Sequence, residues 1–541
     1  MTIASPSYHR RSIQSVSDML RKAAWERPDK IALTYRKDAL AFGAFDDRVD
    51  AIAAGMVEAG IRSGDRVAIY LDKNFEFAIA LVACMRIGAM AVPINPLLKN
   101  QQAGHILANS QARAIITTGR RSSCMEAASF EGMLIRTDTS TTNAQNLVEW
   151  SDLEACGASL PALNGSELDP AAILYTSGST GAPKGVVLSH RNLVAGAQSV
   201  NAYLGTRSDD TILSVLPMSF DAGLSQLTTA IDAQAKIHLL TFLVADEVVA
   251  ACREHAVTSI TGVPPLWHRL TAADWDASTA GTIRTIANTG GHMPAPLLGT
   301  LRRTFPKASP YLMYGLTEAF RSTYLDPMEV ERRPNSIGKA VPNADVRVLR
   351  EDGTEADSGE IGELVHRGAF VTLGYWRAPE ATAARFRPVP DPFGASLRQD
   401  IAVWSGDLVR RDDDGFLYFI GRRDGLIKTS GYRVSATDIE EALLAAPGVS
   451  EAVAFGVPHP TLGQAIVALY VASDSHPDNA REGLDAIGRT CARSLPNYAV
   501  PHEIVMRADL PRNPNGKIDR PLLEAEYRQV FATQSTLEPV R

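Results

Sequence analysis

The sequence has few cysteines, and their positions do not suggest a disulfide framework. The 541 residues contain five cysteines without paired or metal-like spacing: Cys84, Cys124, Cys156, Cys252 and Cys491. Scattered cysteines of this kind suit a reducing compartment, whereas disulfide-stabilised secreted domains carry cysteines in regular sets. We therefore expect a cytoplasmic protein.

The sequence also lacks an excess of positive charge and a long apolar run. Its net charge is −7, whereas nucleic-acid-binding proteins usually carry a strong positive balance. The most apolar stretch, residues 77–94, is interrupted by Arg86 and Pro93, and the N-terminus has no apolar core of signal-peptide length. The sequence therefore predicts neither a nucleic-acid partner nor a transmembrane segment.

Apolar strand-like segments alternate with helical patterns along the first 340 residues. With 45% hydrophobic and 21% charged residues, the chain has the composition of a soluble globular protein, and it is too long for a single core. Four apolar segments each end in a turn rich in Gly, Pro or polar residues: 211–216, 257–263, 283–287 and 311–313. If these strands are parallel neighbours, their turns line one crevice at the carboxyl edge of the sheet. The pattern predicts an α/β fold.

Two further predictions concern the ends of the chain. Ser17 is expected to cap a helix that ends near Arg27, before Pro28. After about residue 341 the pattern changes to shorter alternating strands, and a separate α+β unit follows residue 425. A change of composition and a charged, glycine-flanked turn place a domain boundary at about residues 422–424.

The segment from Tyr175 to Gly185 is a loop rich in hydroxyls and glycines that contains one lysine, Lys184. Glycine permits positive φ, so successive backbone N–H groups can converge on one anion, and the hydroxyls and Lys184 add donors and charge. These features favour a polyphosphate clamp over the alternative, a flexible Gly/Ser hairpin turn. The loop is not a P-loop, because Gly185 rather than Ser or Thr follows the lysine.

Eight short motifs occur in a fixed order along the chain. They are residues 175–185, Tyr314-Gly-Leu-Thr-Glu318, Gly362-Glu-Leu, Gly374-Tyr-Trp376, Trp404-Ser-Gly-Asp407, Gly421-Arg-Arg-Asp424, 427–433 and Pro511-Arg-Asn-Pro-Asn-Gly-Lys517. The series resembles the core motifs of the ANL adenylating enzymes, which comprise acyl-CoA synthetases, peptide-synthetase adenylation domains and firefly luciferase. Residues 217–221 and 314–324 are most similar to the bacterial acyl-CoA ligases associated with exosortase gene clusters.

The resemblance implies a fold and a division of the chain. Residues 1–421 would form a large α/β domain with stacked sheets and a small β-barrel-like subdomain, holding the ATP and acyl sites. Residues 422–425 would form a hinge at Asp424, and residues 426–541 a small mobile α+β domain that acts as a catalytic lid. Gly431 would lie beside the tunnel for the thiol arm.

The resemblance also implies a two-step reaction. A carboxylate attacks the α-phosphate of ATP to give acyl-AMP and pyrophosphate, and a thiol then displaces AMP. Lys517 and Thr317 would act at the α-phosphate, and Glu318 would bind Mg²⁺, a metal that shares oxygen ligands with phosphates. The other implied nucleotide contacts are Thr176, Ser177, Gly178, Ser179, Thr180, Gly181, Lys184, Gly290, Gly291, Tyr314, Asp407 and Arg422. Without the motifs, Lys517 would read as an exposed hairpin lysine, and Asp407 with Arg422 as a surface ion pair.

The acyl pocket implied by the resemblance is polar. Its residues are Phe220, Asp221, Ser225, Gly262, Thr289, Met313, Arg321 and Ser322. A buried carboxylate needs a partner, so Asp221 either binds a cationic substrate group, such as an α-amino group, or pairs with Arg321 inside the protein. Arg321 could instead bind a second substrate anion. This lining favours a small or polar acid, with an amino acid as one option, over a long-chain fatty acid.

The leading functional prediction is an AMP-forming acid–thiol ligase that uses ATP, Mg²⁺ and CoA. The alternative acceptor is the phosphopantetheine arm of a separate acyl or peptidyl carrier protein. Oxidative chemistry of the luciferase kind and a non-catalytic ATP or acyl sensor are competing classes. The intact set of Lys184, Glu318, Asp407 and Lys517 argues against loss of activity.

Overall fold

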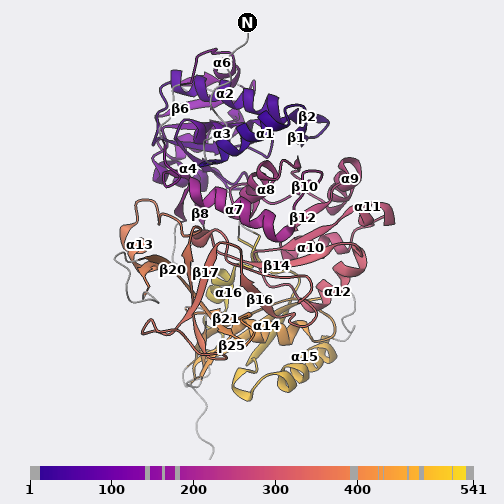
Figure 1. Ribbon diagram of the computed structural model, residues 1–541. Coiled ribbons are helices and arrows are strands. Elements are labelled where there is room, and N and C mark those ends of the chain that lie inside the picture. Colours follow the sequence, from indigo (N-terminus) through magenta and orange to yellow (C-terminus); the bar gives the residue numbers. More distant parts are fainter. Residues whose placement is uncertain are drawn as a thin grey trace, which may run out of the picture.

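A computed structural model gives the fold of the chain. It describes residues 13–140, 146–160, 165–176, 183–389, 400–423, 426–429, 432–459, 462–473, 480–513 and 516–531. Figure 1 shows the first sheet at the top of the view, a larger sheet below it, and the C-terminal unit, in yellow, at the bottom. Among the described residues, no helix is both long enough and apolar enough to cross a membrane.

The first sheet is parallel except for its last strand. Its order is β7 (Leu147–Glu149), β6 (Met133–Arg136), β5 (Ala114–Thr117), β3 (Arg66–Tyr70), β4 (Met90–Pro93), β8 (Pro170–Thr176) and β9 (Lys184–Ser189). β8 and β9 are antiparallel, and they flank the predicted phosphate loop. The side chains of β3 alternate between two cores, as a strand buried on both faces requires: Val67 and Ile69 join one, Ala68 and Tyr70 the other.

The second sheet has fourteen strands and contains the four predicted parallel neighbours. Its order is β17 (Ala344–Leu349), β18 (Ile361–Gly368), β20 (Ile401–Arg411), β21 (Leu417–Arg422), β16 (Ser336–Ala340), β15 (Thr323–Leu325), β14 (Ser309–Tyr314), β13 (Thr285–Asn288), β12 (Ser259–Gly262), β10 (Thr211–Ser214), β11 (Lys236–Leu239), β1 (Ile31–Tyr35) and β2 (Asp38–Ala41), with β19 (Phe386–Pro388) beside β20. β14, β13, β12 and β10 are parallel, as expected. β17, β18, β20 and β21 form an antiparallel run around a small core of their own.

One hydrophobic core lies between the two sheets. It joins residues of β3, β10 and β11 to five helices, α1 (Val16–Glu26), α2 (Phe42–Glu58), α3 (Phe75–Arg86), α7 (His190–Leu204) and α8 (Asp221–Asp232). The outer face of the first sheet is covered by α4 (Asn100–Ser110) and α5 (Cys124–Ala127). The outer face of the second is covered by α9 (Ala245–His255), α10 (Pro264–Thr271), α11 (Ala277–Thr282) and α12 (Ala295–Thr304). Two short helices, α6 (Trp150–Glu154) and α13 (Pro379–Arg385), complete this part.

A five-stranded sheet follows in the C-terminal part of the chain. It contains β22 (Ile427–Thr429), β23 (Tyr432–Val434), β24 (Val449–His459), β25 (Gly463–Ala472) and β26 (Glu503–Arg507), with α14 (Ala436–Leu444), α15 (Ala480–Ser494) and α16 (Arg520–Tyr527). The strands pair only with one another in the described residues, whereas β21 belongs to the large sheet. The chain therefore changes sheet between Arg422 and Ile427.

Two sequence predictions were wrong in detail. Ser15, not Ser17, caps α1, because its hydroxyl accepts a hydrogen bond from the backbone N–H of Asp18, and the helix ends at Glu26. The Ser17 hydroxyl lies inside the helix, where it accepts a hydrogen bond from Nε of the buried Arg86 (2.8 Å). The strands after residue 341 are not uniformly short, since the unpredicted β20 has eleven residues.

Lys73 connects the two sheets. It follows β3, and its ammonium group donates hydrogen bonds to the carbonyl oxygens of Ser214 (2.7 Å) and Leu216 (3.3 Å) at the end of β10. The residue is only 7% exposed, and burial lowers its pKa to about 7. Lys73 therefore fixes the start of the turn that leads into α8.

This burial predicts a pH-dependent stability. Between pH 7 and about 10.5 the unfolded chain keeps the Lys73 proton that the folded chain has lost, so this group's contribution to the free energy of unfolding rises with pH across that window. Lys73→Met should remove that rise. Urea unfolding at a series of pH values measures it, with the exposed Lys37→Met as the control. Equal pH slopes in the wild type and Lys73→Met would refute the assignment.

Candidate active site

The turns after the four parallel strands meet at one edge of the second sheet. The turn after β13 is tied to β12, because the Thr289 N–H donates to the Gly262 carbonyl (3.0 Å). The Asn288 amide donates to the Gly291 carbonyl (2.9 Å), and Gly290 has a φ of +73°, which L side chains rarely adopt. The predicted Gly290–Gly291 pair therefore forms a hydrogen-bonded glycine turn at the carboxyl edge of the sheet.

Tyr314, Asp407 and Arg422 come together although they lie far apart in the sequence. Asp407 and Arg422 are paired in the register of β20 and β21, and Arg422 Nε lies 3.4 Å from Asp407 Oδ1. The Tyr314 hydroxyl donates to Asp407 Oδ2. Burial, followed by the charge of Asp407, holds the pKa of Tyr314 well above its usual value. Tyr314 is therefore a neutral donor that orients the carboxylate.

Glu318 and Lys184 are joined by a tyrosine to which the sequence analysis gave no role. The Tyr375 hydroxyl donates to Glu318 Oε1 (2.5 Å), and Lys184 Nζ lies 5.6 Å from the centre of the Tyr375 ring. Burial and then Glu318 raise the pKa of Tyr375, so this hydroxyl also stays neutral. The segment holding Tyr375 is bound to β9, because the Trp376 N–H donates to the Gly185 carbonyl (2.7 Å). The motif Gly374-Tyr-Trp376, which contains Tyr375, was the sequence feature that could have indicated a role for this tyrosine.

Two further predicted residues, Thr176 and Thr317, lie in described segments, whereas seven others do not. Thr176 pairs with Lys184 at the base of the phosphate loop, and Thr317 lies beside Glu318 in a short 3₁₀ turn. The remaining loop positions, with the predicted hinge and thiol-tunnel residues, lie outside the described residues: Ser177, Gly178, Ser179, Thr180, Gly181, Asp424 and Gly431.

Lys517 reaches the crevice from the C-terminal unit. It lies in a hairpin where the Asn513 N–H donates to the Lys517 carbonyl (2.8 Å) and the Lys517 N–H donates to Asn513 Oδ1 (3.1 Å). Its Cε is 3.9 Å from the point that a Cβ on Gly290 would occupy. His292 Nε2 lies 3.5 Å from Glu441 Oε1 of α14, so a second contact joins the glycine turn to this unit. The hairpin lysine thus lies at the glycine turn of the crevice.

The residues present fit a magnesium ion that is shared with phosphates. Within the described ranges, no cluster of three or more His, Cys, Asp or Glu side chains could hold a metal alone. Glu318 supplies one carboxylate, oriented by Tyr375, and Mg²⁺ in phosphate sites commonly takes one or two carboxylates with the rest of its shell from phosphate and water.

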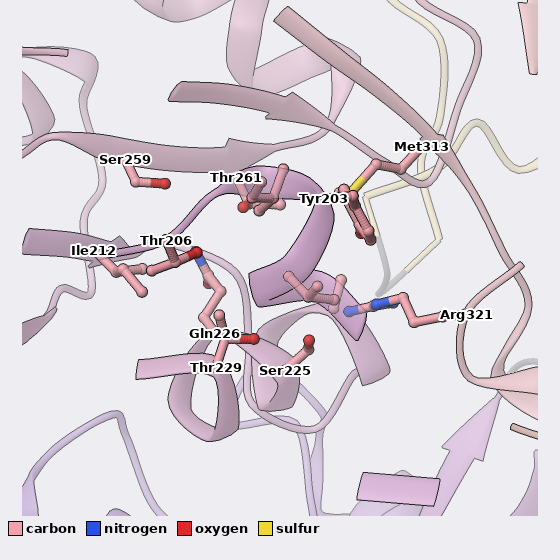
Figure 2. Close-up of a pocket in the computed structure, with 13 residues that line it drawn as sticks. Tyr203, Thr206, Ile212, Ser225, Gln226, Thr229, Ser259, Thr261, Met313 and Arg321 are labelled. Atoms are coloured by element: carbon pink, nitrogen blue, oxygen red, sulfur yellow. The ribbon is translucent and has the colours of Figure 1, made fainter. Parts of the chain in front are cut away.

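A small cavity of about 20 Å³ lies beside the crevice (Figure 2). Of the predicted acyl-pocket residues, Ser225, Met313 and Arg321 line it. Phe220 and Asp221 begin α8 next to the lining residue Ala222, and Asp221 Oδ2 is 3.9 Å from Arg321 Nη1. The others lie outside the lining: Gly262 faces the Trp267 ring, Ser322 is fully buried, and Thr289 belongs to the glycine turn.

Most of the lining was missed by the sequence analysis. The additional residues are Val200, Tyr203, Leu204, Thr206, Ile212, Ala222, Gln226, Thr229, Ser259 and Thr261. Four lining positions, 222, 225, 226 and 229, recur at helical spacing on α8. This periodicity was the sequence feature that could have identified them as one face of the pocket. The prediction considered the turns after the strands and left out the helix face.

Phe320 occupies a strained position in the turn between Glu318 and Arg321. It has a φ of +49°, an uncommon conformation for a bulky residue, and its side chain is fully buried. The ring fills the space beside Gly196 of α7, where a Cβ would lie 2.3 Å from Cε1 of Phe320. Packing against a glycine therefore holds the strained turn that separates Glu318 from Arg321.

Comparison with protein families identifies the family of the chain. A family model described as AMP-binding enzyme matches residues 20–376, and one described as AMP-binding enzyme C-terminal domain matches residues 438–517. The chain belongs to the AMP-binding enzyme family. Its members include the ANL adenylating enzymes, and the reaction class of this AMP-binding enzyme is AMP-forming acid–thiol ligation.

Individual relatives cover nearly the whole AMP-binding enzyme. It is 33% identical to an L-proline–[L-prolyl-carrier protein] ligase of Streptomyces coelicolor, over 89% of this chain and 91% of the relative. It is 31% identical to a sulfoacetate–CoA ligase of Cupriavidus necator, over 93% and 95%. ATP-bound MatB of Rhodopseudomonas palustris has a similar structure (TM-score 0.83, 25% identity, 95% and 99% coverage). So does o-succinylbenzoate-CoA synthetase (MenE) of Bacillus subtilis with its acyl-adenylate (TM-score 0.79, 26% identity, 94% and 97% coverage).

The Tyr375–Glu318 contact predicts a role in the magnesium requirement. Tyr375→Phe removes the donor that orients the Glu318 carboxylate, so the Mg²⁺ concentration giving half the maximal rate of ATP–pyrophosphate exchange should rise about tenfold. Tyr418→Phe, which removes a similar hydrogen bond to Asp412 away from the crevice, should leave that concentration unchanged. An unaltered magnesium requirement in Tyr375→Phe would contradict the proposed role of Glu318.

Proposed function

We propose that this AMP-binding enzyme activates a small polar carboxylic acid with ATP and Mg²⁺, forming acyl-AMP and pyrophosphate, and transfers the acyl group to the thiol of CoA. The observation that carries the proposal is the position of Lys517 beside Gly290, in the turn after β13. The neighbouring strand β14 leads to Tyr314, which donates to Asp407, and to Glu318 in the 3₁₀ turn that follows. Cations and N–H donors are needed there, because the reaction joins two anions that repel each other.

Each side chain has a distinct role in the first step. The substrate carboxylate attacks the α-phosphorus, and the bond to pyrophosphate breaks. Lys517 and Thr317 offset the charge that develops on the α-phosphate and carboxylate oxygens, while Lys184 binds the departing β- and γ-phosphates. Asp407 accepts hydrogen bonds from the ribose hydroxyls. Glu318 would hold Mg²⁺, which would supply positive charge to offset that of the phosphates.

The second step requires a change of position by the C-terminal unit. We propose the division 1–421 and 426–541, with residues 422–425 as the hinge and Asp424 as its pivot. The change of sheet between Arg422 and Ile427 supports this division. Rotation there would withdraw Lys517 and bring Gly431 to the thiol tunnel, since a few connecting residues can absorb such a motion.

A second candidate is the loading of an amino acid onto the phosphopantetheine of a separate carrier protein. Asp221 directly after Phe220 favours it, because this carboxylate can pair with an α-amino group, and one relative is a prolyl-carrier protein ligase. The 3.9 Å distance between Asp221 and Arg321 favours the first candidate, since each charge already has a partner within the protein.

Two finer assignments belong to the proposal. Residues 217–221 and 314–324 support membership of the exosortase-associated acyl-CoA ligases. The five cysteines form no disulfide, and four are buried, which supports a cytoplasmic location.

ATP–pyrophosphate exchange driven by a panel of carboxylic and amino acids tests the function. Lys517→Ala should lower the exchange rate about a thousandfold, because Lys517 acts at the reacting phosphate, and Lys184→Ala about tenfold to a hundredfold, because Lys184 holds only the leaving group. The exposed Lys37→Ala should retain the wild-type rate.

A transfer assay separates the two steps. All three variants should transfer the acyl group from supplied acyl-AMP at the wild-type rate, and comparing CoA with a purified carrier protein identifies the acceptor. The ligase mechanism would be refuted if none of the acids drives exchange, or if Lys517→Ala exchanges at the wild-type rate.

A further inference from the structure

The cavity beside the crevice follows one face of α8. Ala222, Ser225, Gln226 and Thr229 line it at successive turns, starting next to Asp221 at the N-terminus of the helix. Figure 2 shows Arg321 and Met313 at one end of the space and Gln226, Thr206 and Ile212 at the other. Arg321 follows Thr317 and Glu318 closely in the chain, so under the proposed function the Arg321 end would be nearer the phosphates and the Gln226 end would face the far end of the acid.

Gln226 presents an unpaired acceptor at this far end. Its Nε2 donates to the Leu213 carbonyl of β10 (2.8 Å). That bond fixes the orientation of the amide, because only the NH₂ group can face a carbonyl oxygen. The residue is 5% exposed, and its Oε1 has no hydrogen-bond partner among the described residues. A buried carbonyl oxygen of this kind needs a donor from a ligand or water.

Thr229 presents a second polar atom one turn further along α8. The residue is 3% exposed, and its Oγ1 has no hydrogen-bond partner in the described part of the chain. Its neighbour Thr228 is equally buried but donates to the Ser225 carbonyl (3.2 Å) and does not line the cavity. Two unpaired oxygens thus occur on the one helix face that lines the cavity.

The charge of the lining restricts what these oxygens can bind. Arg321 is the one charged side chain among the lining residues, and it lies at the opposite end, 3.9 Å from Asp221. A charged group at the Gln226 end would be buried without a counter-ion, which is strongly unfavourable. A neutral donor avoids this cost.

We propose that the acid carries a neutral hydrogen-bond donor, a hydroxyl or amide N–H, at the end distant from its carboxylate, and that Gln226 Oε1 and Thr229 Oγ1 bind this group. The inference rests on the proposed function and names its substrate class. It predicts discrimination against acids with a methyl group in place of the donor, because such acids leave both oxygens unpaired.

Matched pairs of acids test this inference by ATP–pyrophosphate exchange. Each hydroxy acid is compared with the acid bearing a methyl group in place of the hydroxyl: 3-hydroxypropanoate with butanoate, 4-hydroxybutanoate with pentanoate, 5-hydroxypentanoate with hexanoate, and L-threonine with L-valine. In at least one pair, kcat/KM for the hydroxy acid should exceed that for the methyl acid by about tenfold or more.

Two near-isosteric variants and one control assign the preference to residues. Thr229→Val and Gln226→Met should each bring the ratio of the two kcat/KM values towards one, chiefly by lowering kcat/KM for the hydroxy acid. Thr228→Val, an equally buried change outside the cavity, should keep the wild-type ratio. Two independent variants are used so that poor folding of one does not decide the result.

The possible failures are distinguishable. Exchange driven equally well by the methyl acids, or a ratio unchanged in both Thr229→Val and Gln226→Met, would overturn the inference and leave the ligase function standing. If no acid of the series and no acid of the wider panel drives exchange, the proposed function is overturned, and this inference with it.

Discussion

The parallel pairing of β10, β12, β13 and β14 is the constraint on which the site depends. Parallel neighbours end at the same edge of a sheet, so turns separated by about a hundred residues face one crevice. The core between the two sheets holds this edge in place, and Lys73 adds a polar connection from the first sheet to the end of β10. The turns can then differ in sequence without losing their common position.

Two acidic residues of the candidate site, Asp407 and Glu318, each accept a hydrogen bond from a neutral tyrosine. Tyr314 donates to Asp407, and Tyr375 donates to Glu318. Burial and the adjacent carboxylate raise the pKa of each phenol, so both remain donors at neutral pH. Each tyrosine fixes the direction of its carboxylate without adding a charge, although Asp407 also has Arg422 at 3.4 Å. Under the proposed function, this arrangement orients a ribose contact at Asp407 and a metal ligand at Glu318.

The sequence predicted those parts of the structure that local patterns or ordered motifs encode. The four parallel strands and the C-terminal α+β unit followed from apolar runs and their terminating turns. The pairing of Trp376 with Gly185, which brings Tyr375 to Glu318, depends on contacts between residues far apart in the chain, and no local pattern reveals it. The cap of α1 was misplaced because Ser15 and Ser17 are equally good caps by type, and only the buried Arg86 decides between them. The predicted acyl pocket was incomplete because, in the sequence, the polar residues on one face of the buried helix α8 resemble ordinary core residues. Only the structure shows that two of them have unpaired oxygens.

The proposed reaction proceeds through an acyl-adenylate formed by the substrate carboxylate, and oxygen-isotope transfer tests this step most directly. The acid that drives exchange is labelled with ¹⁸O in both carboxylate oxygens, and the products of a complete turnover to thioester are examined by mass spectrometry. Attack on the α-phosphorus predicts one labelled oxygen in AMP and none in pyrophosphate. Label in pyrophosphate or inorganic phosphate, or unlabelled AMP beside a labelled thioester, would contradict it.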